Sequence, residues 1–305
     1  MVKLAELPQE ELFTSGHRLC AGCGPAVAMR IMTKALRGPT IITTSTGCVE
    51  VGSTIYPYTC WNIPWVHSAF ENAASTAAGI EGALKALSRR GIINEKIDIV
   101  AIGGDGGTFD IGLQALSGAL ERRHDFLYVC YDNEAYMNTG VQRSGATPYG
   151  ASTTTSPAGR AIPGKLVWKK NIAAIAAAHG VPYVATASIA YWNDYISKVR
   201  RGLEVDGPAF VHVYAPCPLG WRIPSEATIQ LAQLAVQTRV FPLYEIIDGR
   251  YVLSLDIPKP KPVEEYLKIQ GRFKHLFTPE CRGEVDVIQA DVERRWAALK
   301  KLCSQ

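Results

Sequence analysis

Residues 97–107 read IDIVAIGGDGG, and this segment carries the most structural information in the chain. Its first half is apolar and β-branched, as in a buried strand, and a glycine-rich turn follows it and leads into a helical pattern at 109–123. Such a turn places free backbone N–H groups and the positive end of a helix at the carboxyl edge of a sheet, where phosphates bind. The glycines allow close backbone approach, and Asp105 offers a hard oxygen ligand for Mg²⁺. Alone, the pattern also fits any phosphate loop or a plain tight turn.

Strand-like and helix-like patterns alternate outward from this segment. Strands are predicted at 40–44, 96–102, 126–131, 183–187 and 209–214, and helices at 25–36, 69–90, 109–123, 171–179, 191–203 and 225–239. Strands that alternate with helices indicate a mainly parallel sheet covered by helices on both faces. The predicted fold class is therefore α/β.

Residues 1–222 are predicted to form this α/β domain, and 223–305 a peripheral C-terminal arm that packs on the core or on a partner subunit. The arm should contain a hairpin around Asp248 and Gly249 and a polar, helical tail. Within the domain, 138–170 is rich in Thr, Ser, Gly and Pro and breaks the alternation. Because irregular segments of that length are usually functional, we expect this one to lie near a site.

Composition excludes several classes of protein. Lys and Arg number 32 against 28 Asp and Glu, a net charge of +4 with no long block of either sign, so no nucleic-acid or membrane-surface binding is expected. The N-terminal stretch has acidic residues where a secretory signal needs an apolar core, and no run of about 18 apolar residues occurs. We therefore expect a cytoplasmic protein whose eight cysteines are reduced and explained by metal binding or burial.

A second motif follows the glycine-rich turn. Counted inclusively, 30 residues run from Gly104 to Asn133, which follows the strand FLYVCY. This resembles the thiamine-diphosphate signature, which opens with Gly-Asp-Gly and closes about thirty residues later with an Asn after a second strand. By that resemblance Asp105 and Asn133 are Mg²⁺ ligands through their side chains and Ala135 through its carbonyl oxygen. Asp132 stands where many members have a first Asn, but the ligand position is the second, which is kept.

Four cysteines form a third pattern. Cys20 and Cys23 are a CxxC pair in a glycine-containing loop, a spacing that allows two thiolates to bind one centre. Cys48 and Cys217 each follow a predicted strand, at the same sheet edge as the glycine-rich turn. Four convergent thiolates suit a structural zinc or a 4Fe–4S cluster, and the ligand set does not separate the two. A redox dithiol lacks the strand that should precede Cys20.

Taken in order, the motifs resemble one family, the β subunit of pyruvate:ferredoxin oxidoreductase and related 2-oxoacid:ferredoxin oxidoreductases. The resemblance spans about 16–222 and part of 262–276. The matching motifs are CAGCG (20–24), TGCVE (46–50), WNIPW (61–65), AFENA (69–73), GDGG (104–107), YDNEAYMNTG (131–140), TPYG (147–150), AHGVP (178–182), ATAS (185–188) and APCP (215–218). The family has a thiamine-diphosphate-binding fold, of which this chain resembles the diphosphate-binding half.

The resemblance implies roles for individual residues. Cys20, Cys23, Cys48 and Cys217 match the positions that hold a 4Fe–4S cluster beside the cofactor. The residues that match cofactor-binding positions are Thr46, Gly47, Gly104, Asp105, Gly106, Gly107, Asn133, Ala135 and Asn138, of which Asn138 matches a catalytic position near the reacting end. Asn138 also fits a plain turn residue, and Thr46 and Gly47 fit a structural loop.

Partners follow from the same resemblance. An α subunit would supply the pyrimidine-binding half and the catalytic Glu, and we expect structural roles for Glu50 and Glu71. A γ subunit and a ferredoxin-like δ subunit would complete the complex, because this chain has no second set of cysteines with cluster spacing. Cys130 and Cys60 are expected to be buried, and Cys281 and Cys303 are assigned no role.

The implied reaction is the coenzyme-A-dependent oxidative decarboxylation of a 2-oxoacid, with electrons passed singly to ferredoxin. Pyruvate is the expected substrate; branched 2-oxoacids, 2-oxoglutarate and oxalate are alternatives. A non-redox thiamine-diphosphate lyase would need the Gly104-to-Asn133 signature without the convergent cysteines. A non-enzymatic alternative is a zinc-bearing scaffold subunit with a vestigial diphosphate loop, and the intact Asp105 and Asn133 argue against it.

Overall fold

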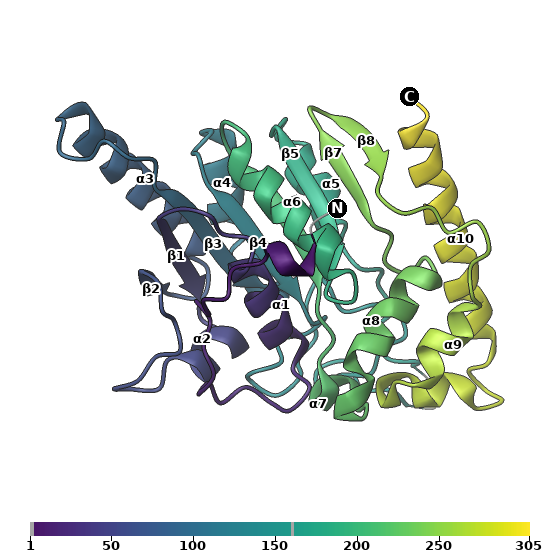
Figure 1. Ribbon diagram of the computed structural model, residues 1–305. Helices are drawn as coiled ribbons and strands as arrows, with labels where there is room; N and C mark the ends of the chain where they lie inside the picture. The colour runs from purple at the N-terminus through teal and green to yellow at the C-terminus, as the bar shows by residue number, and fades with distance from the viewer. Residues whose placement is uncertain (1–2, 160–161) are drawn as a thin grey trace.

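The computed structural model describes residues 3–159 and 162–305. An eight-stranded sheet crosses the molecule in the order β2-β1-β3-β4-β6-β5-β7-β8 (Figure 1). The six strands from β2 to β5 are mutually parallel, and β7 and β8 add an antiparallel hairpin at one edge. The predicted α/β class with a mainly parallel sheet is confirmed.

The strands are β1 (Thr40–Ser45), β2 (Trp65–Ser68), β3 (Asp98–Gly104), β4 (Leu127–Asp132), β5 (Tyr183–Ser188), β6 (Ala209–Tyr214), β7 (Tyr244–Ile247) and β8 (Arg250–Leu253). The α-helices are α1 (Gly24–Thr33), α2 (Cys48–Ser53), α3 (Ala73–Arg89), α4 (Leu113–Glu121), α5 (Ile172–Ala177), α6 (Trp192–Glu204), α7 (Pro218–Trp221), α8 (Thr228–Gln237), α9 (Val263–Lys268) and α10 (Gly283–Cys303). Short 3₁₀ segments are η1 (Leu4–Glu6), η3 (Ser225–Ala227) and η4 (Gly271–Phe277), and η2 (Gly106–Asp110) is a π-helical turn.

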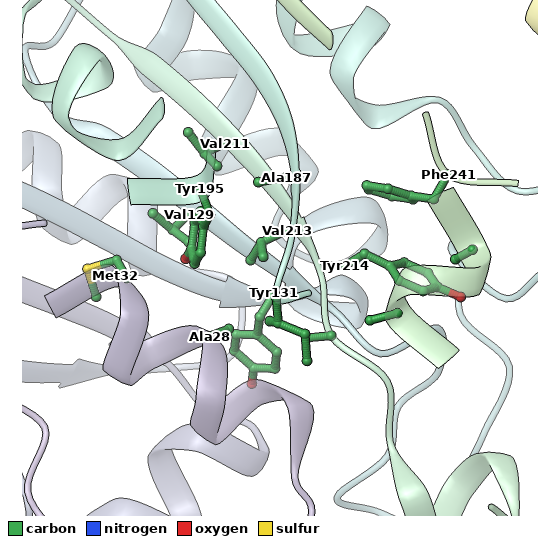
Figure 2. Close-up of a cluster of buried hydrophobic side chains, with 14 of the residues drawn as sticks. Ala28, Met32, Val129, Tyr131, Ala187, Tyr195, Val211, Val213, Tyr214 and Phe241 are labelled. Carbon is green, nitrogen blue, oxygen red and sulfur yellow. The ribbon is translucent and has the colours of Figure 1, made fainter. Parts of the chain in front are cut away.

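Alternate residues of the central strands enter two hydrophobic cores, one on each face of the sheet. Val129 joins the core shared with α1, α6 and α8, whereas its neighbour Tyr128 joins the core shared with α3, α4 and α5. Figure 2 shows the first core, where Ala28 and Met32 of α1 face Val129 and Tyr131. Fully buried apolar side chains of this kind contribute roughly 1.5–3 kcal/mol each. Both faces of the sheet are thus closed, and the strand ends are left for the site.

The C-terminal segment packs on this core. β7 pairs with β5, and Trp296 and Leu299 of α10 are buried in the core on the α3 side of the sheet. Tyr266 and Phe273 are buried in the other core. The segment therefore extends the sheet and contacts both cores, while the division at residue 222 stays a prediction.

Two elements near Cys48 were not predicted. β2 is a four-residue edge strand with half-exposed side chains, so it lacks the apolar run that marks the inner strands. α2 is only six residues long and begins at Cys48 itself. Helix α3 begins at Ala73, four residues later than predicted, because the segment before it forms a turn with Asn72 bonded to Ala69.

The segment 138–170 is irregular throughout its described part, as predicted; residues 160–161 of it lie outside the described residues. Across 3–159 and 162–305, no helix is long and apolar enough to cross a membrane.

Candidate functional site

Four neighbouring parallel strands end at one edge of the sheet. β1, β3, β4 and β6 are adjacent, with Gly104 of β3 opposite Tyr131 of β4 and Asp132 of β4 opposite Tyr214 of β6. The segments that follow these strands carry the predicted site residues, so the sheet brings the diphosphate motif and two of the cysteines to the same edge.

The glycine-rich turn joins β3 directly to η2, without an intervening loop. Asp105 already has helical backbone angles, and π-helical turns of this kind are frequent at functional sites. A Cβ on Gly106 would lie 2.4 Å from the ring of Tyr136, and one on Gly107 would lie 3.0 Å from the carbonyl oxygen of Phe70. A side chain at Gly106 would displace the Tyr136 ring and one at Gly107 would press on the backbone of Phe70, so both positions favour glycine.

Three oxygen-bearing groups converge beside this turn. One side-chain amide atom of Asn133 lies 2.8 Å from Oδ1 of Asp105 and 2.9 Å from the carbonyl oxygen of Ala135. With the amide nitrogen in that position, it donates to both oxygens; with the amide oxygen there, three oxygens meet, which is the ligand arrangement of a hard cation. The three residues predicted as Mg²⁺ ligands are thus the ones that the fold brings together.

Two of the buried carboxylates of this region, Asp105 and Asp132, differ in their electrostatics. Burial and then the negative charge of Asp132 raise the pKa of Asp105 well above its ordinary value, although Ser144 Oγ donates to Asp105 at 2.5 Å. Burial would also raise the pKa of Asp132, but Lys169 and His212, the latter at 2.7 Å, outweigh it and hold the pKa at about 2. The ionised form of Asp105 is therefore less compensated by its surroundings than that of Asp132, which fits a group that meets a cation.

Two hydroxyl groups at the end of β1 are buried without a hydrogen-bond partner in the described part of the chain, Thr44 Oγ1 and Ser45 Oγ. Ser45 Oγ would lie 3.1 Å from a Cβ placed on Gly107, so it borders the glycine-rich turn. Because a buried hydroxyl without a partner costs free energy, these groups fit a site that receives further hydrogen-bonding atoms.

The four predicted cluster cysteines also converge. Burial raises the pKa of Cys48 to about 12, and Cys217, Cys23 and Cys20 raise it further by their charge. The pKa of Cys23 is raised to about 12 by burial and then by Cys217 and Cys20. The CxxC loop reaches this edge because Gly24 N–H donates to the Pro216 carbonyl oxygen at 3.1 Å. Four neighbouring cysteines repel one another as thiolates, so they ionise together only when a metal centre offsets their negative charge.

No group of three or more His, Cys, Asp or Glu side chains within 3–159 and 162–305 is spaced to hold a single metal ion.

The remaining predicted residues lie around these groups. Thr46 Oγ1 is 2.8 Å from Nε2 of His67, and a Cβ on Gly47 would lie 2.7 Å from the hydroxyl of Tyr131. Asn138 is exposed in a turn whose neighbour Met137 packs against Gly220, just after Cys217. Each is at the predicted edge, and the structure does not test the role of any of them.

A buried ionic network supports the turn 132–135, and sequence reasoning missed it. Glu134 adopts a left-handed backbone with φ 65° and pairs with Lys169 at 2.8 Å and with Arg272 at 2.5 Å. Asp132 Oδ1 accepts the Glu134 N–H at 3.0 Å, and Thr147 Oγ1 donates to the Glu134 carbonyl oxygen at 2.7 Å. The sequence signal for this network is His212, a histidine in the otherwise apolar strand AFVHVY that contacts Asp132.

Comparison with known proteins gives three findings. Residues 45–213 match the family model of the thiamine pyrophosphate enzyme, C-terminal TPP binding domain. The chain is 56% identical over 273 residues to pyruvate synthase subunit PorB of Methanocaldococcus jannaschii, covering 89% of this chain and 92% of the relative. It is 47% identical to ketoisovalerate oxidoreductase subunit VorB of Pyrococcus abyssi, covering 97% of this chain and 94% of the relative.

The fold is also similar to a solved structure of 2-oxoglutarate:ferredoxin oxidoreductase from Magnetococcus marinus. The TM-score is 0.57 at 20% sequence identity, covering 75% of this chain and 82% of that chain. At this identity the similarity concerns the fold.

Proposed function

This chain belongs to the family of thiamine-pyrophosphate-binding PorB subunits of 2-oxoacid:ferredoxin oxidoreductases, and from this premise we propose that it binds thiamine diphosphate through Mg²⁺ and carries a 4Fe–4S cluster. Its activity would be the oxidative decarboxylation of pyruvate to acetyl-coenzyme A and CO₂, with two electrons passed to ferredoxin. The observation that carries the proposal is the meeting of Asp105, Asn133 and Ala135 at the sheet edge to which the four cysteines also converge.

The residues fit a metal-bound diphosphate. Asp105 Oδ1, an amide oxygen of Asn133 and the carbonyl oxygen of Ala135 are hard ligands, and the remaining positions around Mg²⁺ suit phosphate oxygens and water. The N–H groups of Gly106 and Gly107 and the hydroxyl of Ser45, which has no partner among the described residues, would donate to the same phosphates. Bound Mg²⁺ would also compensate the buried charge of Asp105.

The cysteines fit a cluster better than a single ion. Four thiolates on one zinc, each about 2.3 Å from the metal, must approach one another closely. A 4Fe–4S cluster is wider, so its four ligands are spread around a larger centre. Cys48 and Cys217 lie at the starts of α2 and α7, and their charges interact with those of Cys20 and Cys23 in the CxxC loop, so these three segments would hold such a centre between them.

Each cofactor would supply chemistry that the chain lacks. When bound, thiamine diphosphate supplies an electron sink at the carbon that loses CO₂, and the 4Fe–4S cluster supplies one-electron acceptance. Asp105, Asn133 and Ala135 would fix the diphosphate end, so that the reacting end has one position relative to the cysteines. Asn138, exposed beside α7, would orient the substrate at that end.

Partner subunits would complete the site. Several apolar side chains in the segments that carry the cysteines and in their neighbours are exposed. They include Val51 of α2, Leu219 of α7 and Tyr58, and such side chains suit burial against another chain. We propose that this chain is inactive alone and that an α subunit supplies the pyrimidine-binding half and the catalytic Glu. A γ subunit would complete the complex, and a ferredoxin-like δ subunit would pass electrons onward to ferredoxin.

Pyruvate is the proposed substrate because PorB of Methanocaldococcus jannaschii is 56% identical to this chain, whereas VorB of Pyrococcus abyssi is 47% identical. Ketoisovalerate, a branched 2-oxoacid, is the second candidate, since VorB is 47% identical over nearly the whole chain.

The test is anaerobic co-purification of the chain with its natural partners, followed by analysis of iron, sulfide, zinc, Mg²⁺ and thiamine diphosphate. Coenzyme-A-dependent reduction of a viologen dye is then measured with pyruvate, ketoisovalerate, 2-oxoglutarate and oxalate. Fastest reduction with pyruvate supports the proposal. A preference for another acid would change the proposed substrate and keep the proposed reaction. A complex that holds iron and thiamine diphosphate but reduces no dye would instead favour a non-redox lyase, and zinc without iron would exclude the cluster.

A further inference from the structure

Trp221 connects the cysteine edge to the turn 132–135. It is the last residue of α7, the short helix that begins after Cys217, and its side chain is fully buried. Its indole Nε1–H donates to the carbonyl oxygen of Asn133 at 2.7 Å, and its backbone N–H donates to the carbonyl oxygen of Cys217 at 3.0 Å. Trp221 is therefore hydrogen-bonded both to the turn at Cys217 and to the turn 132–135.

Arg272 holds Trp221 from the other side. Its guanidinium lies 3.9 Å above the centre of the Trp221 ring, which is a stacked cation–π contact, and the same group pairs with Glu134. Gly271 N–H also donates to the carbonyl oxygen of Arg222, the residue after Trp221, at 3.3 Å. Arg272 is buried, so it is ordered and desolvated rather than a surface charge.

Glu134 explains why the turn needs support. Its left-handed backbone is unfavourable for a residue with a side chain, and such a conformation persists only when its surroundings hold it. The turn that it forms directs the Asn133 side chain and the Ala135 carbonyl oxygen toward Asp105. Trp221 fixes the peptide before Glu134, and Arg272 fixes the Glu134 side chain.

We propose that Trp221 and Arg272 are positioning residues that hold the turn 132–135 in its metal-binding geometry and couple it to the cluster turn at Cys217. This inference rests on the proposed function. It adds that the binding of Mg²⁺ and thiamine diphosphate depends on η4 of the C-terminal segment, which carries Arg272. By linkage, occupation of the cofactor site also alters the surroundings of the cluster, because Trp221 is shared between the two turns.

The test uses the anaerobically purified complex with Trp221→Phe, which keeps an aromatic ring beneath Arg272 but removes the N–H donor and part of the buried ring area. The dissociation constant of thiamine diphosphate at fixed Mg²⁺ should rise about tenfold, equivalent to about 1.4 kcal/mol, because the Asn133 carbonyl loses its donor. Iron content should be unchanged. The electron paramagnetic resonance spectrum of the reduced cluster should differ between cofactor-free and cofactor-loaded wild type, and Trp221→Phe should reduce that difference.

Trp296→Phe is the matched control, because Trp296 is also buried beneath an arginine, Arg239 at 4.5 Å, but lies in α10. Arg272→Lys, which keeps the charge and removes the flat stacking group, is the second variant and decides the matter where Trp221→Phe does not fold. Unchanged thiamine diphosphate affinity and an unchanged spectral difference in either folded variant would overturn the inference. Wild type without bound cofactor or iron would instead count against the proposed function.

Discussion

Replacing Asp105 by Asn should stabilise the metal-free protein while it strongly weakens cofactor binding. The Asp105 carboxylate is buried, and burial together with Asp132 raises its pKa well above the ordinary value. A group of this kind contributes most to stability below its unfolded pKa of 3.8, and that contribution is lost as pH rises through the folded value. Asn removes the charge and keeps an oxygen to accept the Ser144 hydroxyl.

The expected gain in the free energy of unfolding near pH 7 is about 1–2 kcal/mol, less than the full cost of an unpaired buried charge because Ser144 offsets part of it. For a chain of this size the apparent melting temperature should rise by roughly 2–6 °C. Loss of one of the three proposed Mg²⁺ ligands should weaken Mg²⁺-dependent retention of thiamine diphosphate at least about 100-fold.

The assay is thermal unfolding of the complex after chelation of Mg²⁺ and removal of thiamine diphosphate, at several pH values from 4 to 8. Asp132→Asn is the matched control, because Lys169 and His212 stabilise the Asp132 carboxylate, and its loss should destabilise the protein by about 3 kcal/mol. A lower melting temperature for Asp105→Asn in the metal-free complex, or wild-type retention of the cofactor, would refute the reasoning.

Three further outcomes are expected. Cys48→Ala should remove the cluster and its electron paramagnetic resonance signal while thiamine diphosphate stays bound; full iron content would contradict the assignment. Gly106→Ala should weaken thiamine diphosphate binding at least about tenfold in calorimetry, because its Cβ would meet the Tyr136 ring at 2.4 Å, whereas Gly79→Ala, which meets nothing within 4 Å, should not. In acid titration, the stability difference between wild type and Asp132→Asn should be present above pH 3.8 and vanish as pH falls through about 2; a constant difference would show that Asp132 acts without its charge.

The sequence predicted the inner part of the fold well because those strands are buried on both faces. β4, β5 and β6 are buried at every residue, so their apolar runs mark them clearly. β2 escaped prediction because an edge strand with exposed residues has neither an apolar run nor a strict alternation.

In the candidate site, too, the residues in local sequence motifs were predictable and the contacts between residues distant in the chain were not. Asp105 and Asn133 lie in contiguous motifs directly after strands, so sequence reasoning could bring them together, and their role as ligands stays a prediction. Ser144 bonds Asp105, Trp221 bonds Asn133, and Arg272 bonds the neighbouring Glu134, each through tertiary packing over 39 to 138 residues of chain. An arginine in a short 3₁₀ segment of the C-terminal region resembles a surface residue until the fold is known.

The distance along the chain between Glu134 and Arg272 has a consequence for biosynthesis. The two residues are 138 positions apart, and Trp221 is 88 positions from the Asn133 carbonyl oxygen that it binds. During synthesis, the turn 132–135 therefore leaves the ribosome long before the side chains that fix it. If those side chains set cofactor affinity, a nascent or truncated chain cannot hold the cofactor firmly, and cofactor loading marks a polypeptide whose C-terminal segment has already docked.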